Sequence, residues 1–211
     1  GPILDHARPG ADLVGVGKRA GRPSPRQHHV SRLLVDYAKE GGRIVRLKSG
    51  DAGLFGRLEE ELVALREAGI PCEIIPGVPS PLAAAAAAGI PLTRRLTARR
   101  VQFVTGHDVN GQLPRDSDLE ALADPSACTV VFMGKRTFPA LAAALIERGL
   151  APDTPAMLAE AVGTPEAETE RNTLAGLAER LAEDVGHKPA LIFYGPLAET
   201  PLMDEDETQD A

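Results

Sequence analysis

A glycine-rich turn that follows a short apolar run is the first stretch whose residue types could do chemistry. The run, Ile44, Val45 and Leu47, has the pattern of a buried strand, and the turn after it reads SGDAG, with Asp51 as its one carboxylate. Open α/β sheets bind ligands at such turns, because glycine lets the backbone approach a ligand closely. Taken alone, the pattern favours an ordinary strand-to-helix turn over a ligand site, so the rest of the chain has to decide.

Common catalytic and metal-binding patterns are absent from the sequence. The histidines are adjacent or isolated, and Cys72 and Cys128 have no metal-ligand neighbour, which predicts two buried, reduced thiols and no metal site. There is no Walker A sequence, no Gly-x-Ser-x-Gly elbow and no complete Rossmann fingerprint. What remains is a glycine after each of several predicted strands: Gly17, Gly50, Gly77, Gly106 and Gly134.

Charge and hydropathy exclude two classes of protein. The net charge of −7 argues against nucleic-acid binding. No apolar run approaches the roughly 20 residues of a membrane helix, and the first residues lack a signal peptide's basic and apolar regions. We therefore expect a cytoplasmic protein with no membrane segment. Two basic clusters, at residues 18–26 and 94–100, fit either solvated loops or a site for a small anionic ligand.

The elements that must position these turns alternate between strands and helices. Short apolar runs predict strands at residues 11–16, 43–47, 72–75, 101–105, 128–133, 155–161 and 190–194. Apolar residues at three- and four-residue spacing predict helices at residues 27–40, 58–68, 80–88, near 119, 137–146 and 173–184. This alternation predicts an α/β fold in which each domain is a mostly parallel sheet flanked by helices.

A change of rhythm at residues 92–100 predicts a hinge between two domains. The expected division is an N-terminal domain, 1–95, a C-terminal domain, 96–203, and a disordered acidic tail, 204–211. Composition and periodicity alone thus reach a two-domain α/β protein that binds a small anionic ligand.

Six segments in a fixed order add a family resemblance. They read GVGKRAG (15–21), VRLKSGDAGLFGR (45–57), IIPGVPS (74–80), GIPLTRR (89–95), FVTGH (103–107) and VVFMG (130–134). Together they resemble the uroporphyrinogen-III C-methyltransferases of the tetrapyrrole methylase family, over about residues 11–196. No single segment is decisive, but six in order at matching spacing are specific.

The resemblance implies a homodimer of two-domain α/β subunits that bind S-adenosyl-methionine in the cleft between their domains. The implied reaction methylates uroporphyrinogen III at C2 and C7 to give precorrin-2, for sirohaem, cobalamin or haem d1, and releases S-adenosyl-homocysteine. The donor's sulfonium charge activates the methyl group, so positioning rather than a metal supplies much of the rate. The substrate carries eight carboxylates, which gives the arginine-rich clusters an anionic partner.

The resemblance also assigns roles to residues of this chain. Lys18 matches a lysine implicated in catalysis and substrate binding, and Arg19, Arg57 and Arg94 are expected to bind the substrate. Met133 is expected to meet the adenosine part of the cofactor. The full set of expected cofactor contacts is Ser49, Gly50, Asp51, Leu54, Pro79, Ser80, Met133 and Val162.

Several departures keep other functions open. SGDAG replaces the usual GGDPF, a form that resembles later corrin-ring methylases, although LTRR followed by FVTGH favours the first assignment. Pro79 stands where a hydroxyl is common, and Arg94 where a histidine is usual. The family's opening strand, its first glycine-rich turn and an aspartate proposed as the base have no counterpart in these 211 residues. The alternatives are therefore a later precorrin methyltransferase or a non-catalytic, dimerising fragment.

Overall fold

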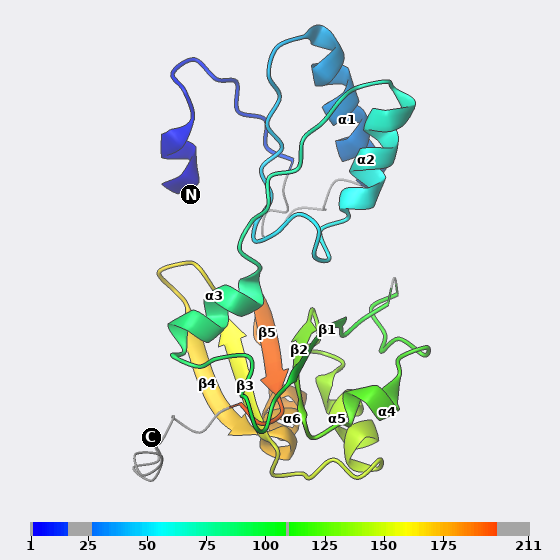
Figure 1. The fold of residues 1–211 in the computed structure, drawn as a ribbon, viewed down its shortest axis with the longest axis vertical. Helices are drawn as coiled ribbons and strands as arrows, with labels where there is room; N and C mark the ends of the chain where they lie inside the picture. Colours follow the sequence, from blue (N-terminus) through cyan, green and yellow to red (C-terminus); the bar gives the residue numbers. More distant parts are fainter. Residues whose placement is uncertain (1, 17–26, 109, 198–211) are drawn as a thin grey trace, which may run out of the picture. The chain divides into compact units, whose positions relative to one another are not determined.

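The computed structural model describes residues 2–16, 27–108 and 110–197. The chain divides into two compact units, Gly1–Gly77 and Val78–Ala211, hereafter unit 1 and unit 2 (Figure 1). The division precedes the hinge expected at residues 92–100, because α3 (Ser80–Ala87) packs on the sheet of unit 2. The division into domains 1–95 and 96–203 stays a prediction.

Unit 2 is built on one five-stranded sheet. Its strands, in the spatial order β1-β2-β5-β3-β4, are β1 (Arg100–Thr105), β2 (Ala127–Phe132), β5 (Ala190–Tyr194), β3 (Pro155–Glu160) and β4 (Glu168–Thr173). β1 pairs with β2 in parallel, whereas the β2–β5, β5–β3 and β3–β4 pairs are antiparallel. Since β2 and β3 both run opposite to β5, β1, β2 and β3 all end at the same edge of the sheet.

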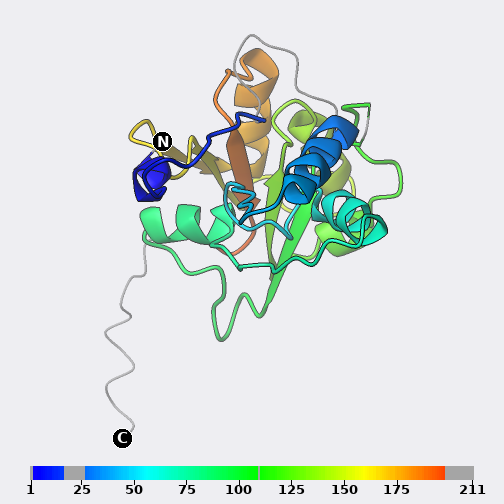
Figure 2. The same cartoon turned by 90° about the horizontal axis from the view of Figure 1, so that it is seen from above.

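Helices cover both faces of this sheet (Figures 1 and 2). On one face lie α5 (Phe138–Ile146) and α6 (Leu174–Glu183), with the short helix α4 (Leu119–Leu122) against α5. On the other face, α3 brings the small side chains of Ala84 and Ala85 into a buried cluster with Val130. Strand β2 is thus buried on both sides, which explains why all but one of its residues, Thr129, are apolar.

The predicted α/β class is confirmed, but the sheet is mixed rather than mostly parallel. The predicted helix at residues 27–40 is confirmed as α1 (Gln27–Glu40), and that at residues 173–184 as α6. Strand β4 was not predicted at all. No helix in the described ranges has both the length and the apolar character that a membrane span requires.

Unit 1 contains a 3-10 helix (Pro2–His6), α1 and α2 (Leu58–Glu67), and α1 packs against α2. The strands predicted at 11–16, 43–47 and 72–75 are wrong, because residues 2–16 and 27–77 form no strand. A strand requires a neighbouring backbone to complete its hydrogen-bonded ladder, and an apolar pattern cannot supply that neighbour. Many of the aliphatic side chains on these segments are therefore exposed, including Leu13, Val45 and Ile75.

Cys72 is exposed as well, contrary to the prediction of two buried thiols, whereas Cys128 is buried.

Candidate functional site

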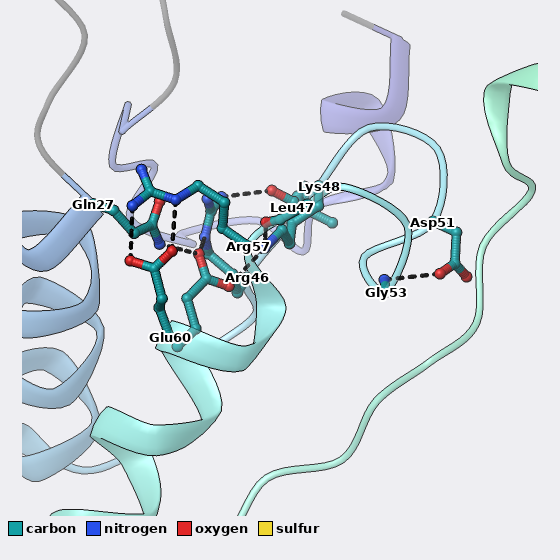
Figure 3. Close-up of polar contacts among 10 residues, drawn as sticks. Gln27, Arg46, Leu47, Lys48, Asp51, Gly53, Arg57 and Glu60 are labelled. Carbon is teal, nitrogen blue, oxygen red and sulfur yellow. Dashed lines mark hydrogen bonds and ion pairs between the residues drawn. The ribbon is translucent and has the colours of Figure 1, made fainter. Parts of the chain in front are cut away.

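In unit 1, Asp51 ties its own turn to a second turn. One carboxylate oxygen, Oδ1, accepts a hydrogen bond of 2.8 Å from the amide of Gly53 (Figure 3). The other, Oδ2, accepts one of 2.8 Å from the amide of Gly77. These bonds, chiefly that of Gly77, hold the pKa of Asp51 below its usual range, because they favour the ionised carboxylate. A Cβ on Gly77 would lie 2.0 Å from the carbonyl oxygen of Gly50, so the close approach of the two turns requires glycine.

A buried carboxylate supports the strand-like segment that leads into the Asp51 turn. Glu61, on α2, is only 2% exposed. Its Oε2 pairs with Lys48 Nζ at 2.9 Å, and its Oε1 lies 3.2 Å from both Arg46 Nε and Gln27 Nε2. Lys48 also donates to the carbonyl of Gly56, on the far side of the turn. The ammonium therefore connects the beginning and the end of the glycine-rich stretch.

The charge balance around Glu61 favours its ionised form. Burial by itself raises the pKa of a carboxyl group, but the hydrogen bond and charge of Lys48 and the charge of Arg46 outweigh burial and lower the pKa of Glu61. The spacing in the sequence indicates this burial: Glu61 lies three residues after Leu58 and four before Leu65, on the apolar face of its helix.

Arg57, an expected substrate ligand, lies at the end of the same stretch. It precedes α2 with a left-handed backbone, φ 56°, and its guanidinium forms hydrogen bonds of 2.6 and 2.8 Å with Glu60 (Figure 3). Both side chains are about half exposed, so this pairing is open to exchange with another anion. Ser49 and Gly50 are exposed on the turn, and Leu54 is half-buried.

In unit 2, the edge where β1, β2 and β3 end carries an unusual backbone. Met133, directly after β2, has φ 55°, and Ala161, directly after β3, has φ 49°. Left-handed conformations cost non-glycine residues about 1–2 kcal/mol, and such strain gathers at functional sites. The ring Nδ1 of His107, after β1, lies 2.9 Å from the Met133 carbonyl oxygen. Two of the expected cofactor contacts, Met133 and Val162, thus lie directly at or next to strained turns of one edge.

These two side chains differ in their surroundings. Met133 is 48% exposed, so it is not a core residue. Val162 is half-buried against the cluster that contains Met157 and Ala159. The β1 and β2 ends also approach closely, since a Cβ on Gly106 would lie 2.3 Å from the Cα of Gly134.

A second ion pair, which sequence reasoning missed, lies at this edge. Lys135 Nζ is 2.5 Å from Glu160 Oε1 and donates to the carbonyl of Lys188 at 3.2 Å. The two side chains are only 10% and 13% exposed. The one signal in the sequence was a lysine immediately after the VVFMG segment. Thr137, the N-cap residue of α5, makes no capping bond with its side chain; its hydroxyl donates to the carbonyl of Gly106, which ties the end of β1 to the same edge.

The remaining predicted residues are distributed between the units. Pro79 is the N-cap of α3 and Ser80 its first residue, both in unit 2. Arg94 donates to the carbonyl of Leu197 at 3.3 Å, also within unit 2. Lys18 and Arg19 lie outside the described residues. Within the described ranges, no group of three or more His, Cys, Asp and Glu residues could hold a metal ion.

Comparison with known proteins places the chain in a family. Residues 2–178 match the family described as Tetrapyrrole (Corrin/Porphyrin) Methylases. The chain is 42% identical over 197 residues to a siroheme synthase of Tolumonas auensis, covering 93% of this chain and 41% of that protein. It is 38% identical over 192 residues to a uroporphyrinogen-III C-methyltransferase of a Sinorhizobium species, covering 91% of this chain and 69% of that protein. The chain belongs to the tetrapyrrole methylase family.

Solved structures agree with this assignment. The uroporphyrin-III C-methyltransferase of Thermus thermophilus, complexed with S-adenosyl-homocysteine, superposes with a TM-score of 0.69 at 35% identity, covering 81% of this chain and 73% of that one. A cobalt precorrin-4 methyltransferase superposes with a TM-score of 0.76 at 27% identity, covering 92% and 78%. The chain spans less than half the length of the siroheme synthase it matches.

Proposed function

We propose that this chain is the S-adenosyl-methionine-dependent methyltransferase part of an enzyme that methylates uroporphyrinogen III at C2 and C7, giving precorrin-2 and S-adenosyl-homocysteine. The observation that carries the proposal is the similarity to the Thermus enzyme, whose structure contains S-adenosyl-homocysteine. The strained edge of unit 2 supports it, because Met133 and Ala161 adopt costly left-handed conformations there, and such strain gathers at functional sites.

The residues present fit an adenosine-containing cofactor. Met133 and Val162 offer apolar side chains next to main-chain groups at the sheet edge, and Pro79 and Ser80 begin α3. In unit 1, Asp51 is held ionised by two amides, and each of its oxygens keeps acceptor capacity for a ligand hydroxyl. Ser49, Gly50 and Leu54 complete the proposed contacts.

The chemistry asked of the chain is mainly orientation. The cofactor supplies an electrophilic methyl group, and the C–S bond electrons remain on sulfur when the ring carbon bonds to that methyl. The protein has to hold the ring carbon in line and accept the proton that this carbon then loses. Arg57 and Arg94 are proposed to bind the substrate's carboxylates, and Lys18 to act near the reacting carbon; the base is not assigned to a residue.

Two further parts of the proposal concern the whole protein. We propose that it works as a cytoplasmic homodimer and that its product feeds sirohaem, cobalamin or haem d1 synthesis. The siroheme synthase relative supports the first of these routes.

A later precorrin methyltransferase is the second candidate. The SGDAG sequence and the similarity to a cobalt precorrin-4 methyltransferase favour it. The lower identity of that comparison, 27% against 35% for the Thermus enzyme, favours uroporphyrinogen III as the substrate.

Calorimetric titration of the 211-residue chain with S-adenosyl-homocysteine tests the proposal first. We expect micromolar binding, about −8 kcal/mol. Anaerobic incubation with S-adenosyl-methionine and uroporphyrinogen III, followed by mass spectrometry, should then show a product with two added methyl groups. Binding without methylation of either uroporphyrinogen III or precorrin-4 would instead identify a non-catalytic fragment, and absence of binding would contradict the proposal.

A further inference from the structure

The ion pair between Lys135 and Glu160 joins two strand ends that are not neighbours in the sheet. Lys135 lies two residues after Met133, and Glu160 is the last residue of β3, directly before Ala161. Strand β5 lies between β2 and β3 in the sheet order. The two ends are therefore about two strand spacings apart, roughly 10 Å, which is too far for a direct backbone hydrogen bond.

The lysine side chain spans this distance. Its Nζ reaches Glu160 Oε1 at 2.5 Å and also donates to the carbonyl of Lys188, just before β5 begins. One ammonium group thus connects the segment after β2 with the last residue of β3 and the segment before β5. The edge is tied further by the amide of Ala161, which donates to the carbonyl of Pro189 at 2.9 Å.

Among the ion pairs that the described residues of unit 2 form, this one is the most deeply buried. The Lys135 and Glu160 side chains are 10% and 13% exposed, whereas those of Arg180 and Glu170 are 36% and 39% exposed. Moving two charges out of water costs free energy that their attraction only partly returns, so such a pair is a poor means of stabilising a fold. A role in fixing one local geometry accounts for its position better.

The geometry that it fixes is that of the two left-handed turns. A non-glycine residue leaves the left-handed region unless neighbouring contacts hold it there. Lys135 lies two residues after Met133, and Glu160 lies directly before Ala161, so their pairing limits how far the two turns can separate or relax.

We infer that Lys135 and Glu160 are positioning residues, which hold the Met133 turn and the Ala161–Val162 turn at the separation that the adenosine part of the cofactor requires. The inference rests on the proposed function, because it takes this edge to be the adenosine site. Neither residue is a catalytic residue: both act through the main chain of the two turns.

The test compares Lys135→Met and Glu160→Gln with the wild-type chain and with Glu170→Gln, which removes the same type of charge from an exposed pair on β4. Calorimetry with S-adenosyl-homocysteine should show affinity about tenfold lower for the first two variants and unchanged for Glu170→Gln. In the enzyme assay the KM for S-adenosyl-methionine should rise by a similar factor, while kcat and the KM for the tetrapyrrole stay within twofold. The charge-exchanged variant, Lys135→Glu with Glu160→Lys, should recover part of the lost affinity.

Hydrogen exchange separates positioning from folding. In Lys135→Met and Glu160→Gln, amides of residues 133–134 and 161–163 should exchange faster while those of β2 and β3 keep their protection. If both variants bind S-adenosyl-homocysteine as tightly as the wild-type chain does, the inference is overturned and the proposed function stays intact. Wild-type chain that fails to bind S-adenosyl-homocysteine would overturn the proposed function and, with it, the inference. If amides throughout both variants lose their protection from exchange, and the charge-exchanged variant does not recover it, the pair has a structural role only. That result would also overturn the inference.

Discussion

The two units hold their candidate ligand-binding turns by different means. In unit 2 the turns that carry Met133 and Ala161 follow strands of a sheet that is covered on both faces. In unit 1 the Asp51 turn follows a segment without strand structure, and side-chain carboxylates tie it in place. Packing therefore fixes the sheet that carries the turns of unit 2, with the Lys135–Glu160 pair at its edge, whereas charged hydrogen bonds fix the Asp51 turn of unit 1.

This difference predicts different sensitivities. The stability of unit 2, whose sheet is covered on both faces, should respond most strongly to cavities in its core. The stability of unit 1 should respond most strongly to the loss of a single buried charge and to acid. Each experiment below changes one of these features in one unit.

The largest effect is expected from a cavity in unit 2. Phe138, the first residue of α5, is fully buried and lies against Tyr194 of β5. Phe138→Ala should lower the free energy of unfolding by about 4 kcal/mol, through lost burial and an unfilled cavity. Urea unfolding followed by circular dichroism measures it. Leu65→Ala, in the smaller core of unit 1, serves as the comparison, and an equal or larger loss there would contradict the packing difference.

The next effect concerns the buried charge of unit 1. Glu61→Gln leaves Lys48 largely buried without its carboxylate, so we expect a loss of about 3 kcal/mol in the free energy of unfolding of this unit. Glu60→Gln is the matched control, because the Arg57–Glu60 pair is about half exposed and should contribute less than about 1 kcal/mol. Similar losses in the two variants would show that burial of Glu61 has no special role.

Acid should act on unit 1 through Asp51 and Glu61, whose pKa values are both lowered in the folded state. A carboxyl group with a lowered folded pKa stabilises the fold above its unfolded pKa, about 4, and loses that contribution as the pH falls through the folded pKa. Stability should therefore decrease as the pH is lowered from 5 towards 3. Asp51→Asn and Glu61→Gln should each show a shallower decrease than the wild-type chain over this range. If the free energy of unfolding decreases equally steeply with falling pH in all three proteins, these carboxyl groups are not the cause.

The same contrast explains which elements could be predicted from the sequence. Strand β2 and helix α1 were predicted because burial on both faces, or on one helical face, leaves a direct apolar pattern. Strand β4, ETERNT, was missed because it is a polar edge strand whose pairing with β3 supplies what its side chains do not. At residues 43–47 a strand was predicted but does not form, because the apolar pattern is present and a neighbouring strand is not.

The candidate site shows a similar limit. The Asp51 turn was found because glycines and a carboxylate are adjacent in sequence. The pairs Lys48–Glu61 and Lys135–Glu160 were not, because their partners are 13 and 25 residues apart and meet only once the fold is formed. A family resemblance could point to Met133 but not to the left-handed backbone that presents it.

The two cysteines allow a test of the difference between the units that requires no substitution and that should perturb the protein least. Cys72 lies on an exposed segment of unit 1, and Cys128 lies in the buried strand β2, where burial raises the pKa of its thiol to about 12. Because the thiolate is the reactive form, a thiol reagent at pH 8 should label Cys72 within minutes and leave Cys128 unlabelled until the protein is unfolded. Mass spectrometry of peptides from native and urea-treated protein measures this difference. Rapid labelling of Cys128 in the native protein would mean that the sheet of unit 2 opens readily, and the contrast between the packed sheet of unit 2 and the charge-held turn of unit 1 would then be lost.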